Sequence, residues 1–152
     1  MRRIGMNAGF RRKAAAVAGA TALLVGGGVA TATTASAGPY CPSGYHCLFE
    51  GNLNTPVHQY FNSDYDFRND VFTSGHGVND NSWSASNSSS GGYESHYYYD
   101  IGYQGGLVFC VNPGSSVEYN QLTDDGIDGN HNGQRDEASS LLLRPTTTVS
   151  CF

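Results

Sequence analysis

The exported part of this chain is predicted to fold as an all-β sandwich of two Greek-key units. Short aromatic or β-branched runs alternate with Gly, Asn, Asp and Pro turns, as in small sandwiches and barrels. No amphipathic helix pattern interrupts them, and two stretches with a period of roughly 50 residues resemble each other. One four-stranded unit cannot bury its own apolar face, so two copies packed face to face are expected.

Residues 1–37 show the three regions of a secretory signal peptide. A basic start is followed by small and apolar residues over 14–30 and by the cleavage pattern Ala35-Ser36-Ala37. The apolar part is rich in Ala, Gly and Thr, and it falls short of the ~20 strongly apolar residues of a membrane span. We therefore expect a secreted, extracellular domain of residues 38–152 that has no membrane contact after cleavage.

Removal of this leader makes the protein strongly acidic. The remaining chain keeps Arg68, Arg135 and Arg144 against all 13 acidic residues, a formal charge of 3 − 13 = −10. Such a charge repels phosphate backbones, so nucleic acid is not an expected partner. It favours cations and basic protein surfaces. The length suits one domain with a modest core, expected to be monomeric.

The predicted strands are eight short runs. They cover 45–50, 57–61, 71–73 and 82–85, and then 97–99, 107–111, 116–119 and 139–143. The polar run 87–92 is interpreted as the connection between the halves, and 124–134 as an irregular stretch dense in Asp, Asn and Gly. The first Greek key then spans 40–88, the second 93–144, and 145–152 forms a tail.

Four cysteines, Cys41, Cys47, Cys110 and Cys151, predict two disulfides in an oxidising compartment. Three pairings are open. We favour Cys41–Cys47 with Cys110–Cys151, because the first two flank a Pro-Ser-Gly turn. A metal site is the weaker interpretation, since no second CxxC-like pair exists.

Several segments resemble βγ-crystallin Greek keys. Tyr98-x4-Tyr103-x-Gly105 is similar to their aromatic corner, which implies that Tyr98 and Tyr103 pack in the core while Tyr97 and Tyr99 point the other way. Residues 79–84 and 135–140 resemble the Asn/Asp-Asn/Asp-x-x-Ser/Thr-Ser element of that fold. With the segments 41–50 and 109–117, the chain resembles the secreted bacterial peptidase-inhibitor family built on a βγ-crystallin-like fold, whose founding type inhibits metalloproteinases.

The chain departs from the βγ-crystallin pattern in both halves. In the first, Asn54 and Pro56 stand where the second aromatic and the glycine of the corner belong. Trp83 takes the Ser/Thr position of the first polar element, and Arg135 takes the first Asn/Asp position of the second. Residues 124–134 look like an insertion. These departures bear more on calcium binding than on the fold.

Two sets of oxygen-bearing side chains are candidates for Ca²⁺, which is the one cofactor considered and is not required by the fold. The crystallin-type set is Asn79, Asp80, Ser82 and Ser84 with Asp136 and Ser139. The second set is Asp128, Asn130 and Asn132, whose alternate spacing before Gly133 resembles the start of an EF-hand loop. The alternatives are a plain surface turn and serines that hold a hairpin by local hydrogen bonds.

No catalytic residue is predicted. The chain has no HExxH or Gly-x-Ser-x-Gly motif, and its five histidines show no helical metal spacing. The preferred function is a secreted inhibitor whose partner is an extracellular peptidase, docking through the 85–96 connection or the 124–134 stretch. The alternatives are a non-inhibitory extracellular module, with or without Ca²⁺, and a small secreted hydrolase.

Overall fold

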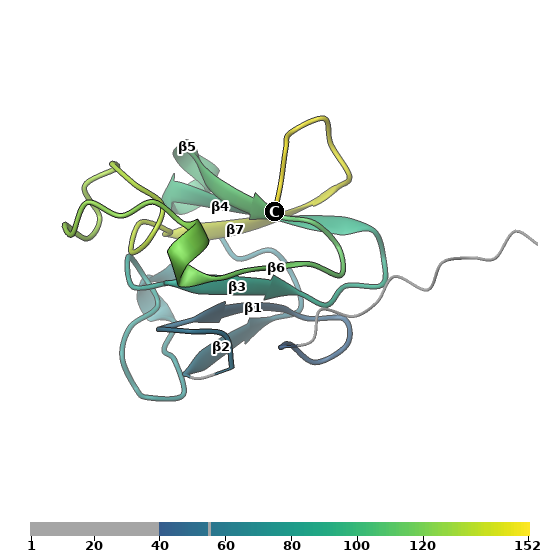
Figure 1. Cartoon of the computed structure of the whole chain (residues 1–152), viewed down its shortest axis with the longest axis horizontal. Coiled ribbons are helices and arrows are strands. Elements are labelled where there is room, and N and C mark those ends of the chain that lie inside the picture. Colours follow the sequence, from purple (N-terminus) through teal and green to yellow (C-terminus); the bar gives the residue numbers. More distant parts are fainter. Residues whose placement is uncertain (1–39, 55) are drawn as a thin grey trace, which may run out of the picture. The chain divides into compact units, whose positions relative to one another are not determined.

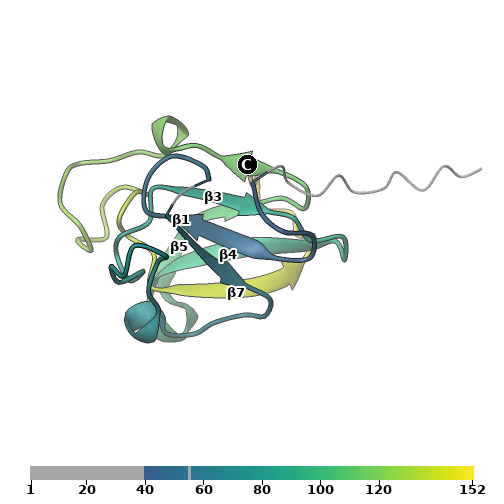
Figure 2. The same cartoon turned by 90° about the horizontal axis from the view of Figure 1, so that it is seen from below.

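A computed structural model describes residues 40–54 and 56–152, so the predicted signal peptide lies outside the described residues. Two antiparallel sheets build the domain (Figure 1), and seen from below the first lies over the second (Figure 2). The first sheet has the order β2 (Val57–Tyr60), β1 (His46–Phe49), β3 (Ser84–Asn87) and β6 (Ser116–Val117). The second has the order β5 (Gln104–Val111), β4 (Tyr93–Asp100) and β7 (Ser140–Pro145).

The helical elements among the described residues are single 3₁₀ turns. They are η1 (Phe67–Asn69), η2 (Ile101–Tyr103) and η3 (Tyr119–Gln121). None of the helices in this part of the chain has the length and apolar character needed to cross a membrane. Strands are thus the extended regular elements in the described part of the chain.

The two halves exchange a strand. β6 comes from the second half but completes the first sheet, where Val117 faces Ala85. In return, Asp64 of the first half bridges to Leu141 of β7, with N–H···O distances of 2.8 and 2.7 Å in the two directions. The first sheet therefore holds strands of both halves, and an isolated bridge joins the second sheet to the first half, which interlocks the two Greek keys. The predicted all-β, βγ-crystallin-like sandwich is confirmed.

The core lies between the two sheets and is aromatic at its centre. Tyr97 is fully buried, and its ring centroid lies 4.7 Å from that of Phe109 on the paired strand. Phe67 of η1 is also fully buried and stacks on Tyr60 of β2 at 5.0 Å. Burial of each such side chain contributes roughly 1.5–3 kcal/mol. These rings join η1 and β2 of the first half to a core shared with the second.

The expected orientation of the tyrosines in β4 was wrong. Tyr97 belongs to the core and Tyr99 packs against it, whereas Tyr98 is only half-buried on the other face. Residues two apart on a strand share a face, so Tyr97 and Tyr99 had to point the same way. Tyr98 instead meets Tyr103 outside the sheet, with ring centroids 6.2 Å apart.

Two strand predictions also need correction. The expected strand 71–73 is reduced to a single bridge between Val71 and Gly77. β4 begins at Tyr93 rather than at Tyr97, because it pairs with β7 from Tyr93 onward. Glu94 and His96 in this part of the strand are polar yet almost fully buried. Glu94 satisfies its carboxylate by accepting from His96 Nε2 at 2.7 Å and from the backbone N–H of Thr147 at 2.9 Å. Hydropathy does not reveal a strand of this kind.

Both disulfides of the favoured pairing are present. Cys41–Cys47 closes the turn before β1, and Cys110–Cys151 ties the C-terminal tail to β5. Backbone bonds flank the second bridge: Phe152 donates to the Cys110 carbonyl at 3.0 Å, and Asn112 donates to the Phe152 carbonyl at 2.8 Å. The tail is therefore part of the fold.

The Cys110–Cys151 disulfide should stabilise the domain more than the Cys41–Cys47 disulfide. It closes a sequence separation of 41 against 6, so the loop-entropy model assigns it about 4 kcal/mol against about 2 kcal/mol. We expect the double variant Cys110→Ser/Cys151→Ser to lose more unfolding free energy in urea than Cys41→Ser/Cys47→Ser. Equal losses would contradict this, and a free thiol in the unreduced wild type would contradict the presence of two disulfides.

His46 should make stability depend on pH. Burial lowers the pKa of His46 from 6.5 to about 4, and its Nδ1 lies 2.7 Å from Ser95 Oγ. As the pH falls, the imidazole of His46 takes up a proton at a higher pH in the unfolded chain than in the folded domain. The stability that neutral His46 contributes is therefore complete above pH 6.5 and is lost as the pH falls toward 4. At about 1.4 kcal/mol per pKa unit, the free energy of unfolding falls by roughly 3 kcal/mol.

The matched variant is His46→Gln, which cannot take up the proton. Its unfolding free energy should fall less steeply than that of the wild type between pH 6.5 and 4.5, measured in urea. Parallel profiles for the two proteins would show that His46 is not the group responsible.

Candidate functional site

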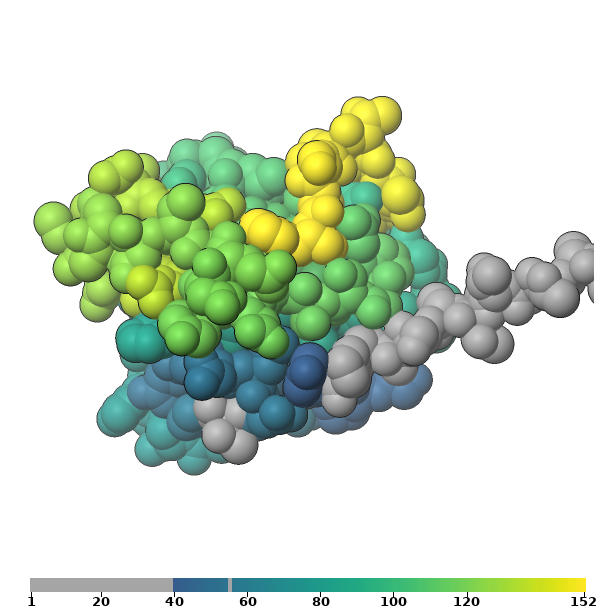
Figure 3. Space-filling model, in the orientation of Figure 1, coloured from purple at the N-terminus to yellow at the C-terminus, as the bar shows by residue number. Residues whose placement is uncertain are grey.

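The 124–134 stretch is an exposed loop that stands out from the sandwich (Figures 1 and 3). Its base is closed, because the backbone N–H groups of Gln134 and Arg135 both donate to the Thr123 carbonyl, at 2.8 and 3.0 Å. Tyr99 reaches out from β4 and donates its hydroxyl to the Gly133 carbonyl at 2.7 Å. The loop therefore has close ends and its own internal bonding, as Ω-loops do.

Two carboxylates organise this loop from inside. Asp125 Oδ2 accepts from the side-chain amides of Asn130 and Asn132, at 2.8 and 2.7 Å, which holds the pKa of Asp125 below its usual range. Glu137 is 1 % exposed and accepts from the backbone N–H groups of Asn130 and His131, at 3.2 and 2.7 Å. The loop thus presents N–H donors inward and wraps around negative charge.

This bonding bears on the EF-hand-like interpretation of Asp128, Asn130 and Asn132. The two asparagines do come together, but at Asp125, which the sequence reasoning did not single out, and they offer amide nitrogen there. Asp128 is exposed on the loop. A calcium site built on these three residues stays a prediction.

Ile127 is the apolar residue that this loop exposes most, at 62 %. Its backbone N–H donates to Asp125 Oδ1 at 3.0 Å, so the position of Ile127 is fixed by the same carboxylate that binds the two asparagines. The other expected docking segment, 85–96, does not form a loop. β3 and β4 take up most of it and bury most of its side chains, which leaves 88–92 as the connection.

A second feature lies where the two polar elements of the halves meet. The Asp80 N–H donates to the Ala138 carbonyl at 3.1 Å, and the Asp136 N–H donates to the Ser82 carbonyl at 3.0 Å. Asp80 and Asp136 both have left-handed φ values, 51° and 56°, which Asp tolerates better than most residues. The two elements are thus related by an approximate two-fold axis between the halves.

The Asp80 side of this pair keeps an oxygen-rich arrangement. Asp80 Oδ1 accepts from the Ser139 hydroxyl of the other half at 2.9 Å, and Asp80 Oδ2 accepts from the Asn79 amide at 2.5 Å. Burial raises the pKa of Asp80. The loop approaches closely: a Cβ on Gly129 would lie 3.0 Å from Asp80 Oδ2. The structure therefore brings Asn79, Asp80 and Ser139 together.

The other predicted serines do not join Asp80. The Ser84 hydroxyl donates to the Gly51 carbonyl at 2.6 Å, and the buried Ser82 hydroxyl has no hydrogen-bond partner among the described residues. Of the residues predicted to bind a cation, only Asn79 and Ser139 therefore hydrogen-bond to the Asp80 carboxylate, and Ser139 belongs to the second half.

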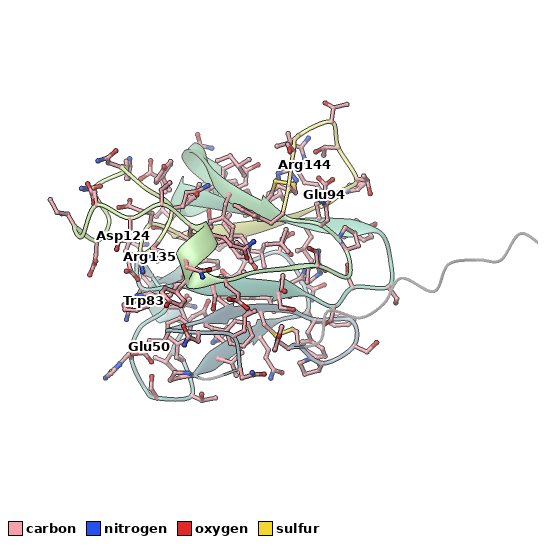
Figure 4. The ribbon with its side chains drawn as sticks, viewed as in Figure 1. Glu50, Trp83, Glu94, Asp124, Arg135 and Arg144 are labelled. Carbon is pink, nitrogen blue, oxygen red and sulfur yellow. A yellow bond between two sulfur atoms is a disulfide. The ribbon has the colours of Figure 1, made fainter. Side chains whose placement is uncertain are left out.

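The Asp136 side is different, because Trp83 contacts the carboxylate and the positive charge of Arg135 acts on it. Trp83 stands at the position equivalent to Ser139 and hydrogen-bonds to the Asp136 carboxylate. The Arg135 guanidinium lies 5.3 Å from the Trp83 ring centroid and 5.8 Å from that of Tyr119, and it forms an ion pair with Asp124 (Figure 4).

Asp136 is nevertheless incompletely satisfied. It is 8 % exposed, its Oδ1 has no partner in the described part of the chain, and burial raises its pKa to about 7. The two departures noted in the sequence, Trp83 and Arg135, therefore come together at this one site. Sequence reasoning found each residue without showing that they meet.

The aromatic corner is also assembled. Tyr98 and Tyr103 contact each other across the folded β4–β5 hairpin, where Tyr103 has φ of 61° and Gly105 has φ of 74°. A side chain at Gly105 would be strained by this φ, and its Cβ would lie 3.0 Å from Tyr99 Cβ.

Within the described residues, one group of His, Cys, Asp or Glu has the spacing of a metal site: His96, Cys110 and Cys151. Its two sulfurs form the disulfide, so they are not available as thiolate ligands. The hydrogen-bonded pair His46 and Ser95 is no nucleophilic site, because Ser95 is fully buried.

No protein-family model and no curated protein matches the chain. A solved structure described as "Evolution of the eye lens beta-gamma-crystallin domain fold" is similar, with 19% identity and a TM-score of 0.49. The match covers 70% of this chain and 92% of that chain. The fold class of this chain rests on its own strand exchange and sheet order.

Proposed function

We propose that residues 38–152 form a secreted inhibitor of extracellular peptidases that docks through the 124–134 loop. The observation that carries this proposal is Ile127, which is 62 % exposed on a loop held by the carboxylates of Asp125 and Glu137. An exposed apolar residue on a pre-ordered loop can enter a cleft with little loss of conformational entropy. The resemblance of the sequence to secreted peptidase inhibitors agrees with this role.

The negative charge of the loop and of the exported chain indicates which peptidases are the better targets. Asp124, Asp125 and Asp128 surround Ile127 in sequence, and the exported chain carries a formal charge of 3 − 13 = −10. A peptidase whose active-site cleft has a positive rim would bind such a loop faster and more selectively than an acidic one. Metallopeptidases come first, because the founding type of the resembling family inhibits them.

The test measures inhibition of a thermolysin-like metallopeptidase and a subtilisin-like serine peptidase by purified residues 38–152. We expect stoichiometric inhibition of at least one class. Ile127→Ala should weaken it about tenfold or more, since burial of an isoleucine side chain is worth roughly 1.5–3 kcal/mol. Val71→Ala is the matched control, because Val71 is an apolar residue 55 % exposed outside the loop. The proposal would be contradicted if neither peptidase class were inhibited, or if Ile127→Ala and Val71→Ala weakened inhibition equally.

A second candidate function is a calcium-stabilised extracellular module. Here the carrying observation is the contact between Asp80 and Ser139, which joins the two halves at 2.9 Å. Ca²⁺ prefers six to eight oxygen ligands, so the few side-chain oxygens at this position imply weak binding, completed by backbone carbonyls and water. We expect no Ca²⁺ at the Asp136 position, because Trp83 replaces the hydroxyl there and the nearby Arg135 supplies positive charge.

Thermal unfolding with Ca²⁺ and with chelator tests this second function. Millimolar Ca²⁺ should raise the melting midpoint of the wild type, because a ligand of the folded state stabilises it. Asp80→Asn should remove the shift, whereas Asp136→Asn, at the equivalent position of the other half, should keep it. An unshifted wild-type midpoint would exclude the site. If the shift were lost in Asp136→Asn but retained in Asp80→Asn, the Ca²⁺ site would lie at Asp136 and not at Asp80.

A further inference from the structure

A cleft with a volume of about 490 Å³ is lined by residues of both halves. It lies among the start of β1, the segment after β2, the connection before β4, and β7. Its lining includes His46, Phe61, Asn62, Tyr93 and Leu143, and no residue of the 124–134 loop or of the Asp80 position. The volume falls within the range of small-molecule sites, about 300–1,000 Å³.

Two aromatic rings flank this cleft, and each rests on a glycine. A Cβ on Gly44 would lie 3.8 Å from the Phe61 ring, and a Cβ on Gly91 would lie 3.3 Å from the Tyr93 ring. Tyr45 also contacts Phe61, with ring centroids 5.5 Å apart. Phe61 and Tyr93 nevertheless remain 64 % and 46 % exposed. The rings are therefore supported from one side and present apolar surface on the other.

Hydroxyl and amide groups line the same cleft. Ser63 Oγ accepts from the Leu143 N–H at 2.9 Å, so its O–H remains free to donate. Ser89 Oγ donates to the Tyr93 carbonyl at 3.0 Å, so its lone pairs remain free to accept. Asn62 adds an exposed amide, which both donates and accepts. A ligand here can form neutral hydrogen bonds of both directions.

The cleft carries no charge, although the chain is rich in acidic residues. None of the described residues that line it is Asp, Glu, Lys or Arg. The one titratable base, His46, is kept neutral because burial lowers its pKa to about 4. A charged ligand would lose hydration and gain no ion pair in this cleft. The lining therefore selects neutral molecules.

We infer that this cleft binds a neutral carbohydrate, with Phe61 and Tyr93 packed against the C–H faces of the sugar and Asn62, Ser63 and Ser89 hydrogen-bonded to its hydroxyls. A sugar combines apolar faces and many neutral hydroxyls, which is the combination that the cleft offers. A wholly apolar peptide side chain would cover the same polar groups without pairing them, at a cost in binding free energy.

Isothermal titration calorimetry of residues 38–152 with three neutral hexasaccharides, cellohexaose, maltohexaose and chitohexaose, tests the inference. At least one should bind with saturation at millimolar concentration or below. Phe61→Ala and Tyr93→Ala should each raise its dissociation constant by about tenfold or more. Tyr65→Ala is the matched control, since Tyr65 is 62 % exposed and does not line the cleft.

Circular dichroism must show that each variant keeps the fold, and Asn62→Ala adds a surface variant that cannot disturb the core. The inference is overturned if none of the hexasaccharides binds, or if Phe61→Ala and Asn62→Ala bind as tightly as the wild type. It is also overturned if N-acetyl-leucine amide saturates the cleft while the sugars do not bind. Binding should persist in chelator and without any peptidase, so the result is independent of the loop and of Asp80.

Discussion

Strand exchange between the halves is the constraint on which the rest of this domain depends. Neither half completes its own sheet: the first sheet needs β6 from the second half, and the second sheet is extended by the bridge of Asp64 to Leu141. Because of this exchange, Tyr60, Phe67 and Tyr97 enter one shared core instead of two small ones. The exchange also brings Asp80 to Ser139 and Asp136 to Trp83, so the candidate cation positions exist only in the interlocked state.

Polar burial is the second notable property of this structure. With 14% charged residues in the whole chain, the domain nevertheless buries Glu94, His96 and Glu137 almost completely. Each carboxylate is compensated by hydrogen-bond donors: Glu94 by His96 and Thr147, and Glu137 by two backbone N–H groups of the loop. A buried charge with such partners fixes the segment that supplies them, here the tail and the loop, because loss of a partner would leave the charge unpaired.

The sequence supported predictions of the fold class, the disulfides and most strands, because these follow from local signals. Turn residues mark the ends of strands, and cysteine number and compartment predict bridges. The missed features depend on contacts distant in sequence. The predicted strand 97–99 leaves out Glu94 and His96, because Thr147, which hydrogen-bonds to the buried Glu94, is remote in sequence. Asp125 gave no sign that it would organise the loop, since its partners Asn130 and Asn132 were read as ligands of a cation.

Arg135 belongs both to the base of the 124–134 loop and to the position where the two halves differ. At the Asp80 position, a carboxylate meets a hydroxyl of the other half, whereas at the Asp136 position Trp83 replaces that hydroxyl and Arg135 supplies positive charge. The same Arg135 forms an ion pair with Asp124 at the start of the loop, and its backbone N–H closes the loop base at Thr123. The guanidinium therefore joins the loop, at Asp124, to Trp83 at the seam between the halves. The loop is thus anchored in the most constrained part of the fold, which is what a rigid docking element requires.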